Sequence, residues 1–330
     1  MVCVRSAGNM KKFRKTVLVT LCVFLLMMTG CSGNGKQKGE KITVVTTIFP
    51  LYDWARNIIK DSEDVELVLL MSNGSDLHNY QPSVNDIIKV TDCDLFIQVG
   101  GESDKWAEDL VRERENSGKK NLNLMDQLSD YLRIDERAEG MQEEEEEGEE
   151  ETEYDEHIWL SLRIAQKACE LIRNELSSLD KGNGSRYAQN CAEYCESLRK
   201  LDEEYKKTVS LGNRKVILFA DRFPFRYMVE DYGLEYYAAF KGCSAESEAS
   251  FETIKFLAEK VDEKELKYIL ILENNDGRIA RTIMENTARK NQETVVIDSL
   301  QSVTGQDAEK GAGYLQIMQN NLEVLRKVLN

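Results

Sequence analysis

Histidine is almost absent from this chain of 330 residues, which contains only His78 and His157. The sequence also has no HExxH, GxSxG, P-loop or GxGxxG motif, the patterns that accompany common hydrolytic and nucleotide-dependent chemistry. Its eight cysteines include no CxxC pair, which is the spacing of many structural zinc sites. Together these absences predict that the protein is not an enzyme.

Positive charge is also in deficit. Lys and Arg number 43 against 59 Asp and Glu, a formal net charge of −16 at pH 7. Because nucleic acids are polyanions, such a chain is not expected to bind them, whereas it attracts cations. We interpret the cysteines after residue 31 mainly as buried small apolar residues, with one disulfide possible in an oxidising compartment: Cys93, Cys169, Cys191, Cys195 and Cys243.

The N-terminus has the three parts of a bacterial lipoprotein signal. Basic residues at positions 11–15 precede an apolar run, 16–28, which ends at Thr29-Gly30-Cys31. The run is too short for a comfortable transmembrane helix. We therefore predict a signal peptide over residues 1–30, with either Met1 or Met10 as the start, then lipidation of Cys31 and a polar tether over 31–40. This places the mature protein on the extracytoplasmic face of the cell membrane.

Beyond the tether, short apolar β-branched runs alternate with segments of helical periodicity. Because these runs are apolar on both faces, they predict parallel strands covered by helices, at 42–49, 65–71, 95–99, 215–220, 234–240, 268–273 and 294–298. A segment without glycine or proline, 186–211, predicts one long helix. We expect an α/β fold with two lobes, 41–185 and 212–330, each a mostly parallel sheet flanked by helices, joined by that helix.

Both histidines lie at borders between polar and apolar sequence. His78 belongs to a polar loop after the second predicted strand, and the next helix is one that Ser83 can cap, with Asp86 three residues later. His157 follows a run, 143–156, in which eleven of fourteen residues are acidic, which we interpret as a solvated loop. Since loops at the carboxyl ends of parallel strands are where α/β proteins place ligands, the pair predicts a binding site.

Several segments, in the same order along the chain, resemble the metal-binding substrate-binding proteins of bacterial ABC transporters for zinc and manganese. The similar segments are Val44-Val-Thr-Thr-Ile-Phe-Pro-Leu-Tyr-Asp53, Asp76-Leu-His78-Asn-Tyr-Gln-Pro-Ser83, Val99-Gly-Gly-Glu-Ser-Asp-Lys-Trp106, Asp155-Glu-His157-Ile-Trp159, Tyr232-Gly-Leu234, Glu248-Ala-Ser250 and Ile297-Asp298-Ser-Leu300. The resemblance implies that His78, His157 and Asp298 are metal ligands, that a rigid helix joins the lobes, and that the partner is an ABC permease.

The third ligand departs from the family's pattern. Family members usually place a histidine or glutamate just before an aromatic-x-Tyr segment, where this chain has Arg222, whose guanidinium cannot coordinate a cation. Asp221, one residue earlier, is our candidate in its place, with Glu246 and Glu273 as alternatives. Asp221 can instead cap a helix that begins near Pro224.

Two imidazoles with one or two carboxylates form a borderline-soft site, which suits Zn²⁺, with Mn²⁺ or iron as alternatives, better than Mg²⁺ or Ca²⁺. We therefore predict a monomeric, lipid-anchored protein that captures a divalent transition metal between two lobes and delivers it to an ABC permease. A surface adhesin or structural lipoprotein with the same fold is the alternative, since fold does not dictate function.

Overall fold

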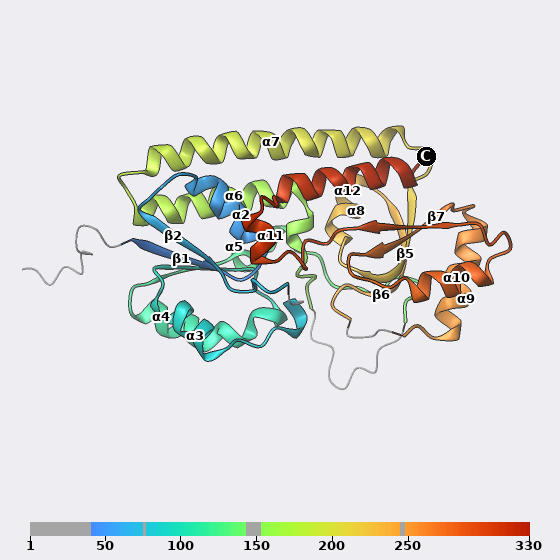
Figure 1. Cartoon of the computed structure of the whole chain (residues 1–330), viewed down its shortest axis with the longest axis horizontal. Helices are drawn as coiled ribbons and strands as arrows, with labels where there is room; N and C mark the ends of the chain where they lie inside the picture. Colours follow the sequence, from blue (N-terminus) through green and yellow to red (C-terminus); the bar gives the residue numbers. More distant parts are fainter. Residues whose placement is uncertain (1–40, 75–76, 143–152, 245–247) are drawn as a thin grey trace, which may run out of the picture. The chain divides into compact units, whose positions relative to one another are not determined.

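Short apolar runs near the N-terminus form a four-stranded parallel sheet in the order β2-β1-β3-β4 (Figure 1). The computed structural model describes residues 41–330 except 75–76, 143–152 and 245–247. The strands of this lobe are β1 Ile42–Thr46, β2 Val65–Leu69, β3 Leu95–Gln98 and β4 Lys120–Asn123. Its helical segments are α2 Phe49–Ile59, η1 Leu77–Asn79, α3 Val84–Asp92, η2 Glu102–Ala107, α4 Glu108–Asn116, α5 Leu124–Gln127, η3 Ser129–Tyr131, η4 Ile158–Leu160 and α6 Leu162–Leu179.

The second lobe repeats the arrangement with the order β6-β5-β7-β8, again all parallel. Its strands are β5 Val216–Phe223, β6 Glu235–Lys241, β7 Tyr268–Leu272 and β8 Glu293–Ile297. Its helices are α8 Arg226–Tyr232, α9 Phe251–Glu263, α10 Arg278–Asn286 and α12 Tyr314–Val328, whereas α11 Gly305–Glu309 lies against α2 of the first lobe (Figure 1). The predicted α/β class, with two helix-flanked parallel sheets and a long connecting helix, is confirmed.

One strand was not expected from the sequence. β4 reads Lys-Asn-Leu-Asn, and only Leu122 of these four residues is buried. The strand forms because its backbone pairs in parallel with β3, from Leu95 opposite Lys120 to Gln98 opposite Asn123. An edge strand needs apolar residues on only part of its surface, so hydrophobic pattern alone does not detect it.

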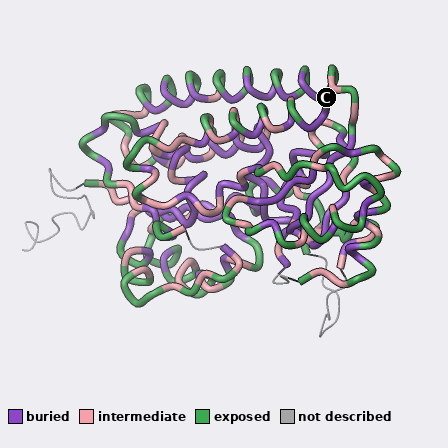
Figure 2. The backbone as a smooth tube through the Cα atoms, turned by 45° about the vertical axis from the view of Figure 1, so that its right-hand side comes forward, coloured by how far each residue is buried: buried purple, intermediate pink, exposed green. Residues whose placement is uncertain are grey.

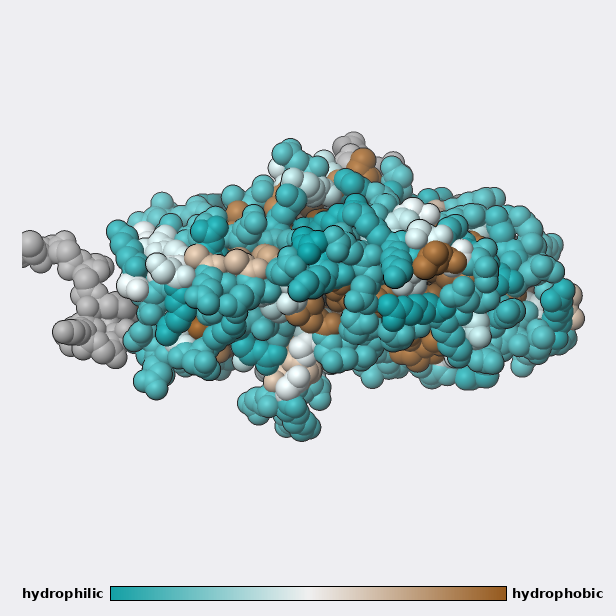
Figure 3. Space-filling view, turned by 90° about the horizontal axis from the view of Figure 1, so that it is seen from above, coloured by the Kyte–Doolittle hydropathy of each residue, from teal (hydrophilic) through white to brown (hydrophobic). Residues whose placement is uncertain are grey.

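The long helix α7, Gly184–Leu211, runs along both lobes (Figure 1). One face of α7 is buried and the opposite face is exposed (Figure 2); the buried face carries Tyr187, Cys191, Tyr194, Leu198, Leu201 and Tyr205. Burial of each of the two leucines contributes about 1.5–3 kcal/mol. Figure 3, which views the molecule from the side of α7, shows mainly hydrophilic residues there.

Hydrogen bonds fix α7 to both halves of the fold. Asn190 Nδ2 donates to Ile58 O in α2 at 2.9 Å, and Tyr205 OH donates to Met318 O in α12 at 2.6 Å. Tyr194 OH donates to Asp53 Oδ2 at 3.2 Å, and the same oxygen accepts from Tyr314 N at 3.0 Å. Since α2, α7 and α12 share these buried bonds, the lobes are braced against large relative motion.

Some of the predicted features lie outside the described residues. These are the signal peptide, Cys31 and the tether within 1–40, most of the acidic run at 143–152, and Glu246. Within the described chain, no helix combines the length and apolar character needed to cross a membrane.

Candidate metal centre

The two histidines meet at the carboxyl-terminal side of the first sheet. His78 is carried by η1, in the connection after β2, and His157 directly precedes η4. Their Nε2 atoms lie 3.1 Å apart, and the ring centroids are 5.1 Å apart. Two imidazole nitrogens this close need a proton or a cation between them, because two facing lone pairs repel. A hydrogen bond from one Nε2–H to the other Nε2 satisfies this contact, and a metal cation can take the place of that proton.

His157 is held by Asp155, two residues earlier in the chain. Its Nδ1 lies 2.8 Å from Asp155 Oδ1, and its backbone N–H donates to the same oxygen at 2.8 Å. A carboxylate accepts, so this contact places a proton on Nδ1 and leaves Nε2 as the ligating nitrogen. Tyr227 on α8 donates its OH to Asp155 O at 2.6 Å, so the second lobe supports the segment. Trp159, also fully buried, packs against the ring with centroids 5.1 Å apart.

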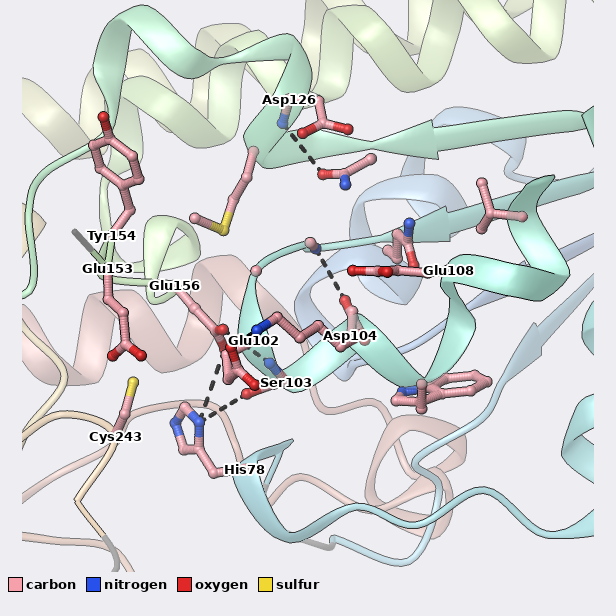
Figure 4. A pocket seen from close by; sticks show the side chains of 18 of the residues that line it. His78, Glu102, Ser103, Asp104, Glu108, Asp126, Glu153, Tyr154, Glu156 and Cys243 are labelled. Carbon is pink, nitrogen blue, oxygen red and sulfur yellow. Dashed lines mark hydrogen bonds and ion pairs between the residues drawn. The ribbon is translucent and has the colours of Figure 1, made fainter. Parts of the chain in front are cut away.

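His78 is oriented through Ser103 and Glu156 (Figure 4). Its Nδ1 lies 2.8 Å from Ser103 Oγ and 3.8 Å from Glu156 Oε2. Glu156 Oε1 in turn accepts from Ser103 N at 2.9 Å. Both histidines thus use Nδ1 for protein contacts and direct Nε2 toward each other, as metal-ligating histidines commonly do.

The electrostatic surroundings favour positive charge at the site. Burial opposes protonation of His157, but the nearby carboxylates of Asp155, Glu156 and Asp135 outweigh it, and the pKa of His157 is raised above 6.5. Burial also raises the pKa values of Glu156 and Asp135. The buried carboxylates around His157 carry more negative charge than one protonated imidazole can balance. A divalent cation would balance the remaining charge.

Cys243 joins the two histidines. A ligand atom from each of His78, His157 and Cys243 lies within 4.8 Å of the others, and this is the one such group of three or more His, Cys, Asp or Glu among the described residues. Cys243 follows β6 and is partly exposed, and the five cysteines after residue 31 are all free. Burial and the charges of Asp155 and Glu156 raise the pKa of its thiol. Of the five cysteines expected to be buried, Cys243 and Cys195 are only half-buried, whereas Cys93, Cys169 and Cys191 are buried.

Because Gly242 has no side chain, the backbone next to Cys243 can lie close to His157. A Cβ at Gly242 would lie 2.9 Å from His157 Cε1 and 3.0 Å from Phe223 O. We predict that Gly242→Ala displaces the imidazole and weakens zinc binding about tenfold, measured by competition with a chromogenic chelator. Gly313→Ala is the matched control, because a Cβ there meets no atom within 4 Å. Equal zinc affinity in both variants would contradict the predicted role of Gly242.

A cavity of about 1070 Å³ reaches the site, and His78 and Cys243 both line it (Figure 4). Its wall carries several carboxylates, Glu102, Asp104, Glu108, Asp126, Asp135, Glu153 and Glu156. Five buried polar atoms of lining residues have no close hydrogen-bond partner: Tyr80 OH, Gln98 Oε1, Asp104 Oδ1, Trp106 Nε1 and Glu156 Oε2. Burial, aided by the charge of Glu156, raises the pKa of Asp104 to about 7. Such a wall suits water and hydrated cations.

Asp221 lies elsewhere, in β5, and outside the group of histidines and Cys243. Its Oδ2 accepts from Leu272 N at 3.0 Å and Asn275 Nδ2 at 2.6 Å, and its Oδ1 accepts from Arg222 N at 2.8 Å. These bonds connect β5 to the end of β7. Asp221 therefore does not cap a helix near Pro224, and α8 begins at Arg226.

We predict that Asp221→Ala lowers the free energy of unfolding by about 1–3 kcal/mol, because buried N–H groups lose their acceptor. Zinc affinity of the folded variant should change less than about threefold, since the carboxylate is committed to these bonds. Urea unfolding and zinc titration measure the two quantities, and Asp276→Ala, at an exposed carboxylate, is the control. A large loss of zinc affinity with unchanged stability would restore Asp221 as a ligand.

Asp298 follows β8 and lies close enough to Glu273 for the two carboxylates to repel each other. Its Oδ1 accepts from Leu300 N at 2.7 Å, and Asn321 on α12 bonds both backbone groups of Asp298, at 2.9 and 2.7 Å. The Glu273 carboxylate accepts from Ser299 N at 2.8 Å and Ser299 Oγ at 2.6 Å. Burial raises both pKa values, and the charge of Asp298 adds to the rise at Glu273. Neither carboxylate belongs to the group around the histidines.

Comparison with known proteins identifies the family and the fold of this chain. The family described as ZnuA, zinc-uptake complex component A periplasmic, matches residues 44–328. The chain belongs to this family. Zinc-binding lipoprotein AdcA of Streptococcus pneumoniae (strain ATCC BAA-255 / R6) is 31% identical over 320 residues, which cover 96% of this chain and 61% of AdcA. High-affinity zinc uptake system protein ZnuA of Bacillus subtilis (strain 168) is 29% identical, covering 97% of this chain and 98% of the relative.

Solved structures of ZnuA-like proteins share the architecture. Zn(II)-bound AdcA from Streptococcus pneumoniae superposes with a TM-score of 0.70 at 27% identity, over 88% of this chain and 58% of that chain. The metal-dependent lipoprotein YcdH from Bacillus subtilis gives a TM-score of 0.71 at 25% identity, over 88% and 99%. This chain therefore spans about 61% of the length of the AdcA it matches, and nearly all of the Bacillus relative.

Within this ZnuA family member, Arg222 lines a second hollow of about 550 Å³, together with Asp221 and Glu273 of the second lobe and Gly74 and Asn79 of the first. The candidate residues thus divide into two places. His78 and His157 meet, joined by Cys243, whereas Asp221 and Glu273 line the hollow beside them. Sequence reasoning missed Cys243 and Ser103; the signal available for both was their position just after a parallel strand, β6 and β3 respectively.

Proposed function

We propose that the mature protein captures Zn²⁺ at His78 and His157 and delivers it to an ABC permease. The observation that carries the proposal is the approach of the two Nε2 atoms to 3.1 Å, with each Nδ1 in a protein contact. Borderline-soft nitrogen ligands suit Zn²⁺, and Mn²⁺ is the alternative cargo. Zinc-binding AdcA and zinc-uptake ZnuA, as the relatives are named, support this choice.

The route to the site also fits a hydrated divalent cation. The cavity that reaches His78 is lined by carboxylates, which raise the local concentration of cations. These carboxylates can replace some of the water around a cation, but they bind zinc less tightly than a pair of histidines does. In the proposal, zinc loses its water at the end of this cavity, where the imidazoles replace it. The bracing of both lobes by α7 implies that release needs only a small displacement of one lobe.

The rest of the proposal concerns the location of the protein. Cys31 carries the lipid, the tether at 31–40 leads to the described unit, and the monomeric protein acts at the extracytoplasmic face without catalysing a reaction. The relative named as a lipoprotein supports the anchor. Replacing Cys31 by Ser should move the protein from the membrane fraction to the soluble fraction, and retention in the membrane would refute the anchor.

Zinc binding and uptake test the central claim. The chain, purified without added metal, should contain about one zinc by elemental analysis, and uptake of radioactive zinc by cells lacking the gene should be restored by the wild-type gene. His78→Ala should not restore uptake, whereas Asp276→Ala, at an exposed carboxylate, should. Finding bound manganese instead of zinc would identify manganese as the cargo. The proposal would be overturned if the purified protein held no metal and bound no zinc in a titration.

A further inference from the structure

We propose that Cys243 is a third protein ligand, so that a thiolate from the second lobe completes a His₂Cys site and selects zinc over manganese. This inference rests on the proposed function and specifies how the site discriminates between metals. It concerns the ligand set alone, so a zinc protein with a different third ligand would leave the proposed function intact.

The distances suit a tetrahedral ion. Two nitrogens bound at about 2.0–2.1 Å with tetrahedral angles lie about 3.3 Å apart, close to the 3.1 Å between the two Nε2 atoms. With a zinc–sulfur bond of about 2.3 Å, the sulfur would lie about 3.6 Å from each nitrogen. Cys243 Sγ already lies within 4.8 Å of a ring nitrogen of each histidine. The sulfur would therefore have to approach each nitrogen by no more than about 1.2 Å.

The backbone holds Cys243 in this place. Lys241 ends β6, and Ser244 N donates to Lys241 O at 3.4 Å, which closes a turn with Gly242 and Cys243 at its centre. Gly242 lies so close to His157 that an added Cβ would approach Cε1 to 2.9 Å. The thiol is thus carried by a short turn that is packed directly on a ligand ring, which fixes its position better than a long loop would.

The thiol also joins the two lobes. His78 and His157 both belong to the first lobe, and Cys243 follows β6 of the second. The described acidic candidates in the second lobe have other contacts: Asp221 accepts from three N–H groups, Glu273 accepts from Ser299, and Asp298 accepts from Leu300 N. A bond from zinc to Cys243 would therefore make metal binding a contact between lobes, which histidines of one lobe cannot do alone.

Coordination at Cys243 is a balanced acid–base step. The S–H bond breaks, sulfur keeps the electron pair and donates it to Zn²⁺, and the proton leaves to water in the cavity that Cys243 lines. No electron is transferred to or from the metal. The thiolate neutralises one of the two charges of the ion, and soft sulfur favours Zn²⁺ over the harder Mn²⁺. The fourth position of the ion is left for a non-thiol ligand.

Cobalt(II), a spectroscopic substitute for zinc, tests the sulfur bond directly in the full mature chain. We expect cobalt-loaded wild type to show a thiolate-to-cobalt charge-transfer band in the near ultraviolet, which zinc abolishes by displacement. Cys243→Ser should lose the band, whereas Cys195→Ser, at another partly exposed free cysteine, should keep it. Zinc affinity should fall at least about tenfold in Cys243→Ser, and manganese affinity less than about threefold.

A second measurement does not depend on any variant. Bound zinc should protect Cys243 of the wild type from alkylation by iodoacetamide, as measured by mass spectrometry of its peptide, while Cys195 stays equally reactive with and without zinc. Zinc binding by wild type without a sulfur band and without protection of Cys243 would overturn the His₂Cys site and leave the proposed function standing. Absence of zinc and cobalt binding by wild type would instead refute the proposed function.

Discussion

Replacing both histidines, His78→Ala with His157→Ala, is expected to abolish high-affinity zinc binding while the chain still folds. Zinc sites with a full set of protein ligands bind with about 10–16 kcal/mol, so loss of two ligands should cost several kcal/mol, or more than about a thousandfold in affinity. The measurement is zinc titration against a competing chelator, with the fold checked by circular dichroism.

Each single variant should also weaken binding strongly, and the two losses should not add. The imidazoles share one ion, and their Nε2 atoms lie 3.1 Å apart, so removing one already destroys the site that the other serves. Removing Asp155, which only orients His157 through the 2.8 Å contact to Nδ1, should cost about 10–100-fold. Unchanged zinc affinity in the refolded double variant would show that these two residues do not form the zinc site.

The meeting of the two histidines could be predicted from the sequence only in part. Each histidine lies at a border between polar and apolar sequence, and His78 follows a parallel strand, whose carboxyl end is where α/β proteins place ligands. The sequence therefore predicted which residues to watch. It did not contain the 3.1 Å separation, because His78 and His157 are 79 positions apart and meet only after the sheet has formed.

The capping of α3 was predictable for a simpler reason. Ser83 and Asp86 are three positions apart, and the structure shows the reciprocal capping box, with Asp86 N donating to Ser83 Oγ at 3.2 Å and Ser83 N to Asp86 Oδ2 at 3.1 Å. Local geometry fixes such contacts, so spacing is sufficient evidence. The contacts of Asp221 show the opposite case, since its partners Leu272 and Asn275 come from 51 and 54 positions later.

Cys243 shows why the proposed ligand set is harder to predict from the sequence than the fold. A cysteine after an apolar strand is most often a small buried residue, and nothing local distinguishes a thiol that faces two imidazoles. The distinguishing feature is Gly242, whose missing Cβ admits His157, and that contact joins residues 85 positions apart in separate lobes. Hydrophobic pattern specifies lobes and strands, whereas convergence of polar side chains depends on how the lobes are placed.

Acid is expected to release zinc and, at the same time, to stabilise the metal-free protein. The native pKa of His157 is raised above 6.5, the value of an unperturbed histidine. A raised pKa means that the native state binds the proton more tightly than the unfolded state does. Its contribution to stability is therefore fully present below about pH 6.5 and is lost as the pH rises through the native pKa.

The buried acids change the stability of the metal-free protein with pH in the same direction. Burial raises the native pKa values of Glu156 and Asp135 above 4.5 and 3.8, so their contributions are also present at low pH and are lost as the pH rises through their native values. The metal-free protein should accordingly be more stable at about pH 5.5 than at about pH 7.5. Zinc supplies the missing positive charge, so its stabilising effect should grow over the same interval.

Thermal unfolding with and without saturating zinc, from about pH 5.5 to 7.5, measures both effects. The zinc-induced rise in Tm should increase with pH, because each ligand proton that zinc displaces changes the affinity about tenfold per pH unit. His157→Gln should flatten the pH dependence of the metal-free protein, and Lys255→Gln, at an exposed lysine, should not. A metal-free Tm that rises toward neutral pH in the wild type would show that the carboxylates around His157 do not carry the excess negative charge inferred for this site.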